Sequence, residues 1–281
     1  MKIVIAGCSG FVGMELKAFF EGKGKSVFAL KVRRDTPIEH VCEAIEGADV
    51  LINLAGLSIF GRWDEAYKKA LYTSRIETTR KLIEAIKLCQ NRPLKFLSTS
   101  AVGIYPNDVV CDESTAEFSS SYLAHICIDW EKEALKAEAF GVCTSILRFG
   151  VILGKKGGMI EKIRFPFSLG LGGRIGSGQQ PLSWIHIDDL CEAYMHVIEN
   201  KNPVCNLCAP EAISNIEFTK ILGSLMHRPT FFPIPAFVLR LIFNEGANFM
   251  LEGQRAYPKG LLESGFEFKY PTIREALKSL L

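Results

Sequence analysis

The sequence predicts an α/β fold in which a doubly wound parallel sheet is followed by a smaller C-terminal lobe. Short apolar runs alternate with helical patterns through the first 155 residues, as expected for a parallel sheet covered by helices on both faces. A glycine-rich loop follows the first apolar run. Beyond residue 155 glycines and prolines become frequent and the helical patterns shorten, which indicates a second, smaller lobe.

The elements of the first lobe follow from apolar runs and helical spacing. Strands are expected at residues 2–7, 26–32, 49–56, 94–100 and 143–153. Helices are expected at residues 11–23, 38–47, 64–90 and 120–140. The segment "LSWIHI" is expected to return to the main sheet as a strand. We therefore predict a nucleotide-binding domain over residues 1–155, completed by about 182–200, and a substrate lobe over 156–281.

The loop "IAGCSGFVGMEL" spaces three glycines three residues apart, between a strand and a helix. In this setting the first glycine permits a tight turn, the second lets the backbone approach a pyrophosphate, and the third lets helix and strand pack closely. The N–H groups at the start of the helix then bind the phosphates. An ordinary glycine turn is the alternative. The residues expected to contact the cofactor here are Gly7, Ser9, Gly10, Phe11, Val12 and Gly13.

The end of the second predicted strand indicates which dinucleotide is bound. NAD enzymes place an acidic residue there to bind the ribose hydroxyls. This chain has "ALKVRRD", in which Lys31 and Arg33 precede the first acid, Asp35. Cations suit the 2′-phosphate of NADP, so we predict NADP as the cofactor. A solvated basic turn is the alternative.

Composition limits the other functions. The net charge is +2 and the basic residues form no long run, which argues against nucleic acid as a partner. No apolar run approaches the roughly 18 residues of a membrane span, so no membrane partner is expected. Nine scattered cysteines, an odd number, are typical of reduced thiols and a cytoplasmic location. Packing explains the C-x-x-C of Cys205 and Cys208 better than a metal, and no metal site is predicted.

Several motifs together resemble a known family. "INLAG", "STSAVGIY" and "WIHIDDL" are similar to those of extended and atypical short-chain dehydrogenases/reductases. "RWDEAYKKALYTSRIETT", "IDWEKEA" and "LEGQRAYP" resemble, more narrowly, the "epimerase family protein" subgroup of the NAD-dependent epimerase/dehydratase superfamily. The resemblance covers essentially the whole chain. It implies a Rossmann-type domain, NADP(H) binding and a small-molecule substrate, such as a nucleotide sugar, held by the C-terminal lobe.

The resemblance also implies positions for the site. It places Lys31 beside the adenosine ribose and Val151 near the nicotinamide. Arg75 matches a cofactor-contacting arginine, with a helix-surface salt bridge as the alternative. The further positions expected at the cofactor are Leu54, Ala55, Gly56 and Ser98.

The catalytic set is where this chain departs from the superfamily. The superfamily uses a Ser or Thr, a Tyr, and a Lys four residues after the Tyr. Ser100 and Tyr122 are the expected catalytic residues, but the position four after Tyr122 is Ile126. A shifted register supplies Cys127 instead, which is no cation either. Two functions therefore stay open: an oxidoreductase or epimerase-like enzyme with a non-standard catalytic set, and a non-catalytic NADP(H)-binding sensor or scaffold.

His186 and Asp188 are expected to have structural rather than catalytic roles. His186 in "WIHIDDL" is expected to pack behind the sheet. Asp188 is expected to cap the helix that follows, because an aspartate oxygen accepts well from the first free N–H groups of a helix.

Overall fold

The central sheet confirms the predicted parallel α/β architecture. The computed structural model describes residues 1–107 and 109–281. Six parallel strands lie in the order β10-β6-β4-β3-β1-β2. Their bounds are β1 Lys2–Ala6, β2 Ser26–Leu30, β3 Val50–Asn53, β4 Lys95–Ala101, β6 Cys143–Phe149 and β10 Val204–Leu207. The strand order reverses between β1 and β3, which is where open sheets of this kind bind ligands.

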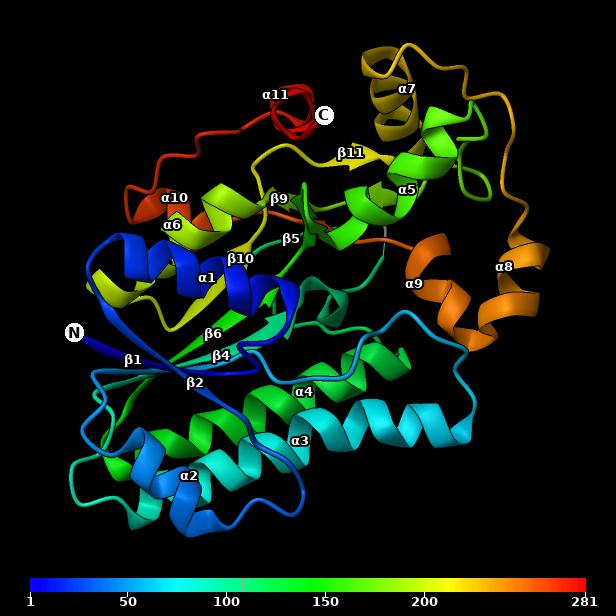
Figure 1. Ribbon diagram of the computed structural model, residues 1–281. Helices are drawn as coiled ribbons and strands as arrows, with labels where there is room; N and C mark the ends of the chain where they lie inside the picture. The colour runs from blue at the N-terminus through cyan, green and yellow to red at the C-terminus, as the bar shows by residue number, and fades with distance from the viewer. Residues whose placement is uncertain (108) are drawn as a thin grey trace.

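Helices cover both faces of this sheet (Figure 1). One face carries α1 (Phe11–Gly22) and α6 (Ile187–Glu199), and the other carries α2 (Ile38–Ile45), α3 (Glu65–Leu88) and α4 (Tyr122–Leu135). The two-residue period of a strand explains the two cores. In β1, Ile3 and Ile5 belong to one core, and Val4 and Ala6 belong to the other.

The strand expected over residues 143–153 is two strands, because the chain changes partners at Gly150. β6 ends at Phe149, and β7 (Val151–Gly154) pairs outside the main sheet with β9 (Trp184–His186). A Cβ at Gly150 would lie 2.8 Å from the Ser183 carbonyl oxygen, so only glycine fits this crossing. The expectation that "LSWIHI" returns to the main sheet is therefore wrong. The sixth strand is β10, which carries Cys205 in the core.

The rest of the chain builds a second core beside the sheet. Trp184 of β9 packs there with side chains from α5 (Gly158–Ser168), α7 (Asn215–Leu225) and α11 (Ile273–Leu280). The shorter elements are η1 Val102–Ile104, β5 Val110–Cys111, η2 Lys136–Phe140, β8 Pro181–Leu182, β11 Ile213–Ser214, α8 Ala236–Phe243, η3 Glu245–Ala247, α9 Asn248–Leu251, β12 Arg255–Ala256 and α10 Lys259–Glu263. Within the described ranges, no helix combines the length and the apolar character needed to cross a membrane.

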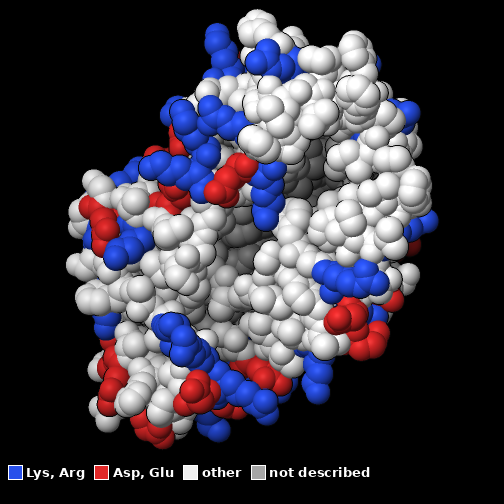
Figure 2. Space-filling model, turned by 45° about the vertical axis from the view of Figure 1, so that its right-hand side comes forward, with Lys and Arg blue, Asp and Glu red and all other residues white. Residues whose placement is uncertain are grey.

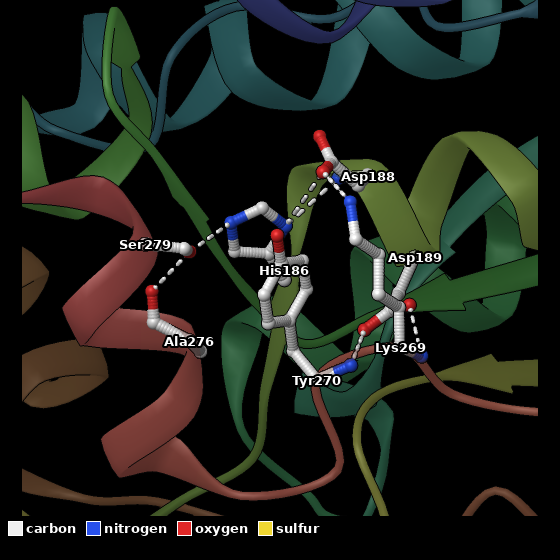
Figure 3. Close-up of polar contacts among 7 residues, drawn as sticks. All are labelled: His186, Asp188, Asp189, Lys269, Tyr270, Ala276 and Ser279. Carbon is white, nitrogen blue, oxygen red and sulfur yellow. Dashed lines mark hydrogen bonds and ion pairs between the residues drawn. The ribbon is translucent and has the colours of Figure 1, made fainter.

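A polar cluster joins β9, α6 and α11 (Figure 3). His186 is the N-cap of α6: its Nδ1 accepts from the backbone N–H of Asp188 at 3.1 Å. Nε2 therefore carries the hydrogen and donates to Ser279 Oγ at 3.1 Å. The expectation that Asp188 caps the helix is wrong, since Asp188 lies in its first turn. Asp189 accepts from the backbone N–H groups of Lys269 and Tyr270.

This cluster predicts an acid-sensitive fold. Burial lowers the pKa of His186 from 6.5 to about 4, and Lys269 lowers it further while Asp188 opposes the shift. The folded state therefore binds the proton less readily than the unfolded state, so stability is complete above pH 6.5 and falls as the pH drops towards 4. The loss is at most about 3 kcal/mol, at 1.36 kcal/mol per unit of pKa.

The test is urea unfolding of the wild type and His186→Asn between pH 7 and pH 4.5. Asparagine retains an N-cap acceptor but does not titrate in this range. We expect the wild type to lose about 1–3 kcal/mol more than His186→Asn over this interval. Parallel stability curves for the two proteins would show that His186 does not cause the acid sensitivity.

Candidate functional site

The candidate residues gather because the parallel strands end at one edge of the sheet. The pairing register sets Asn53 at the end of β3 beside Ala6 of β1 and Ser98 of β4. The loops after these strands therefore meet at the strand-order reversal. The glycine loop follows β1, and the segment from Leu54 to Gly56 follows β3.

The three loop glycines have different surroundings. Gly7 has φ +84°, and a Cβ there would lie 2.8 Å from the Leu54 carbonyl carbon. A Cβ on Gly13 would lie 2.6 Å from Cys8 Cα. Gly10 is the N-cap of α1, and a Cβ there would have only the Gly7 carbonyl oxygen near it, at 3.5 Å. Gly7 and Gly13 are thus required by packing, whereas Gly10 borders open space at the start of a helix.

The residues between these glycines attach the loop to the second lobe. A Cβ at Gly157 would lie 2.2 Å from the ring of Phe11, and one at Gly154 would lie 2.3 Å from it. Val12 packs against the core beneath α1, and Ser9 is exposed. The turn between β7 and α5 thus rests on the phenyl ring at the start of α1.

A buried polar group supports the turn after β3. The side-chain amide of Asn53 donates to Thr79 Oγ1 at 2.8 Å, and its oxygen accepts from the Ala55 N–H at 3.2 Å. The indole N–H of Trp130 also donates to Thr79 Oγ1, at 2.9 Å. Ser98 is buried, with Oγ 3.5 Å from the Asn53 amide nitrogen. These contacts hold the backbone of Leu54, Ala55 and Gly56 in place.

Arg75 of α3 lies against this turn. Its guanidinium donates to the Leu71 carbonyl at 3.0 Å and to the Leu57 carbonyl at 2.9 Å. A Cβ on Gly56 would lie 3.2 Å from Arg75 Cζ. Burial lowers the pKa of Arg75, and within the described ranges no carboxylate pairs with it. The guanidinium has five N–H donors, so it retains donors for an anionic ligand.

Ser100 belongs to a buried charged network. Its hydroxyl donates to Glu131 Oε1 at 2.6 Å. Arg148 Nε donates to the same oxygen at 2.8 Å, and a terminal nitrogen of Arg148 donates to Glu131 Oε2 at 2.8 Å. All three side chains are buried, at 1% exposure for Ser100, 9% for Glu131 and 4% for Arg148. The Ser100 hydrogen is thereby committed to Glu131, and its lone pairs are left to accept from a ligand.

The same network continues to β10, the sixth strand of the central sheet. Arg148 donates to the Tyr105 hydroxyl at 2.7 Å, and Tyr105 donates to Asn206 of β10 at 2.9 Å. Burial raises the pKa of Tyr105 to about 12, although Arg148 opposes the shift. No sequence motif predicted that Arg148 or Asn206 would lie at the site. An arginine inside the apolar run "SILRFGVIL" was the available signal, since a buried charge requires a partner.

Tyr122 points to α3. Its hydroxyl donates to the Lys68 carbonyl at 2.9 Å, and the Lys68 ammonium lies 4.9 Å from the centre of its ring. Burial raises the pKa of Tyr122, and the charge of Lys68 reduces that shift without reversing it. The ammonium is itself paired with Glu245 at 3.0 Å. The phenol is therefore protonated at neutral pH.

The remaining predicted positions lie around the same edge. Lys31 and Arg33 are exposed directly after β2. Val151 begins β7, and its N–H donates to the Ser183 carbonyl at 2.8 Å. Cys42, Glu46 and Cys89 form the one group of metal-type ligand atoms found in the described part of the chain. They lie at the C-terminal ends of α2 and α3, at the opposite edge of the sheet.

The loop after β3 also joins the two lobes. Arg62 donates to the Leu241 carbonyl at 2.6 Å, and the Asn244 amide donates to the Trp63 carbonyl at 3.0 Å. The rings of Phe60 and Phe249 meet edge to face at 4.9 Å. Figure 2 shows a hollow in the face of the molecule drawn there, with mostly uncharged walls and both basic and acidic side chains near its margins. Such a hollow suits a bound small molecule.

The fold and this site define a dinucleotide-binding protein of the Rossmann type. The chain belongs to the NAD dependent epimerase/dehydratase family, whose model matches residues 3–208. A domain of unknown function matches residues 234–280. The resemblance inferred from the motifs is thereby confirmed.

Relatives and solved structures agree with this assignment. Epimerase family protein YfhF of Bacillus subtilis is 36% identical, covering 100% of this chain and 98% of its own. Epimerase family protein SDR39U1 of Mus musculus is 33% identical, covering 100% of both chains. The crystal structure of human SDR39U1 (isoform 2) with NADPH superposes with a TM-score of 0.91 at 30% identity, covering 100% of this chain and 99% of that one. UDP-glucuronic acid 4-epimerase from Bacillus cereus, with a TM-score of 0.79 at 16% identity, shares the fold.

The buried pair Glu131–Arg148 leads to a stability prediction. Arg148→Met leaves the Glu131 carboxylate buried without its counter-charge and should cost about 3–5 kcal/mol. Adding Glu131→Gln removes that charge, so the double variant should be less destabilised than the sum of the single variants by more than about 1 kcal/mol. Chemical denaturation measures all three. Lys17→Met, which breaks the exposed pair with Glu21, should cost less than about 1 kcal/mol. Strict additivity would contradict the coupling.

Proposed function

We propose that this protein binds NADP(H) at the strand-order reversal. The observation that carries the proposal is the contrast within the glycine loop: Gly7 and Gly13 are required by packing, whereas Gly10 borders open space at the start of α1. Open space beside free N–H groups suits a pyrophosphate. The human relative crystallised with NADPH, which is 30% identical, supports the choice of ligand.

The surrounding residues fit the other parts of this cofactor. Lys31 and Arg33 are exposed cations at the end of β2, where a 2′-phosphate is read. Arg75, with unused donors and no carboxylate partner in the described ranges, would bind a phosphate near Gly56. Val151 would lie near the nicotinamide. When bound, this cofactor supplies or accepts a hydride.

We infer an oxidoreductase or epimerase-like enzyme centred on Ser100. Ser100 donates its hydrogen bond to Glu131, so its oxygen would accept a hydrogen bond from a substrate hydroxyl or amine. The hydrogen bond of Tyr122 to Lys68 and its raised pKa argue against Tyr122 as the proton carrier. The substrate would be a small molecule in the hollow, with residues 156–281 as the lobe that binds it.

The alternative is an NADP(H)-binding protein without chemistry. The position four residues after Tyr122 is Ile126, which is buried, so the lysine of the superfamily has no substitute there. A cytoplasmic location suits either function, since all nine cysteines are free thiols and most are buried.

Binding is tested with Gly10→Val. A branched side chain there occupies the space proposed for the pyrophosphate but meets no protein atom closer than 3.5 Å at its Cβ. We expect a folded variant with at least a hundredfold weaker NADPH binding, measured by titration of NADPH fluorescence. Gly22→Ala, at the other end of the same helix with no atom near its Cβ, should bind normally. Undiminished affinity in folded Gly10→Val would remove the loop from the site.

Catalysis is tested by following NADPH absorbance at 340 nm. Small alcohols and amines and a metabolite extract are added to the protein with NADP⁺, and UDP-hexoses are tested separately with NADP⁺. We expect NADPH formation that is lost in Ser100→Ala and retained in Tyr122→Phe, and UDP-hexose turnover well below one per second. No NADPH formation with any addition would favour the non-catalytic alternative. Fast epimerisation that is lost in Tyr122→Phe would restore Tyr122 as the catalytic residue.

A further inference from the structure

The basic turn after β2 is held from behind by a lysine of α3. The Lys81 ammonium donates to three backbone carbonyls: Arg33 at 3.0 Å, Arg34 at 2.8 Å and Thr36 at 2.9 Å. The turn closes on itself as well. The Arg33 N–H donates to Thr36 Oγ1 at 2.9 Å, and the Thr36 N–H donates to the Arg33 carbonyl at 3.2 Å.

These contacts use the whole donor capacity of Lys81. An ammonium group has three hydrogens, and three carbonyls receive them. Lys81 is half-buried, and no carboxylate lies within ion-pair distance of it in residues 1–107 and 109–281. Its charge is therefore balanced by peptide dipoles, and none of its hydrogens is free for a ligand.

The three carbonyls point towards α3, which leaves the arginine side chains of the turn exposed to solvent. With the carbonyls of residues 33, 34 and 36 directed at α3, the side chains of Arg33 and Arg34 remain exposed on the turn. The turn leads directly into α2, whose N-cap is Pro37. A short exposed segment with two arginines would otherwise have to be ordered when an anion binds, at a cost in conformational entropy.

We propose that Lys81 is a positioning residue for recognition of the 2′-phosphate. It holds the 33–36 turn in the shape that presents Arg33 and Arg34 to that phosphate, and it does not touch the phosphate itself. This inference rests on the proposed NADP(H) function. It predicts that Lys81 controls the preference for NADPH over NADH rather than dinucleotide binding in general, because only NADPH carries the 2′-phosphate.

The experiment compares NADPH and NADH affinities in the wild type and Lys81→Met. Methionine keeps the aliphatic length of the side chain but removes the three donors. We expect NADPH binding to weaken about tenfold while NADH binding changes less than twofold. Lys87→Met is the matched control: it removes the same charge from an exposed site near the end of the same helix and should leave both affinities unchanged. Cofactor fluorescence titration at low and moderate salt measures each affinity.

A second variant separates the hydrogen bonds from the charge and serves if Lys81→Met does not fold. Lys81→Gln keeps two N–H donors for the carbonyls without the charge, so it should retain more of the NADPH preference than Lys81→Met and still lose at least threefold. Thermal unfolding confirms that each variant is folded. A wild type without NADPH preference would overturn both the NADP assignment and the role of Lys81. A wild type that prefers NADPH, with an unchanged preference in Lys81→Met or Lys81→Gln, would overturn the role of Lys81 alone.

Discussion

The close approach of three backbones at the strand-order reversal is the constraint on which the site depends. The loop after β1 lies so near the turn after β3 that a Cβ at Gly7 would come within 3 Å of Leu54 and Ala55. The start of α1 lies as near to Cys8, which excludes a side chain at Gly13. This packing directs the free N–H groups of α1 into the space beside Gly10. It also places the ring of Phe11 under the turn that begins the second lobe.

Two buried polar networks hold the two parts of the proposed site at the edge of the sheet. Asn53, Thr79 and Trp130 stabilise the turn against which Arg75 lies. Glu131 and Arg148 hold Ser100 on the other side and continue through Tyr105 to β10. Burying such groups is costly unless each finds its partners, and here each does. The Ser100 network therefore joins β4, β6 and β10 of the central sheet to α4.

Local sequence patterns predicted most of the helices and strands, because the spacing of apolar residues and of glycines reflects the conformation of neighbouring residues. The local patterns gave wrong predictions where a strand end or a helix cap depends on residues far away in the sequence. The break at Gly150 follows from the approach of Ser183, and the cap of α6 is His186 because Ser279 lies behind it. In the candidate site, the glycine loop could be predicted from the sequence, because its three glycines are regularly spaced between a strand and a helix. The pairing of Glu131 with Arg148 joins a helix to a strand, so spacing along the chain could not reveal it.

The geometry around Ser100 narrows the chemistry of an enzyme on this scaffold. A serine that donates to a substrate carbonyl must have a free hydrogen, but Ser100 donates its hydrogen to Glu131 Oε1, and the two oxygens are 2.6 Å apart. The carboxylate is in turn held by two nitrogens of Arg148, so it has little freedom to release Ser100. Ser100 is thus suited to accept a hydrogen bond from an alcohol or amine, the kind of substrate used in the oxidation direction of hydride transfer. A reduction at this site would instead require a proton donor other than Ser100. Tyr122 is not placed to be that donor, because its hydroxyl donates to the Lys68 carbonyl.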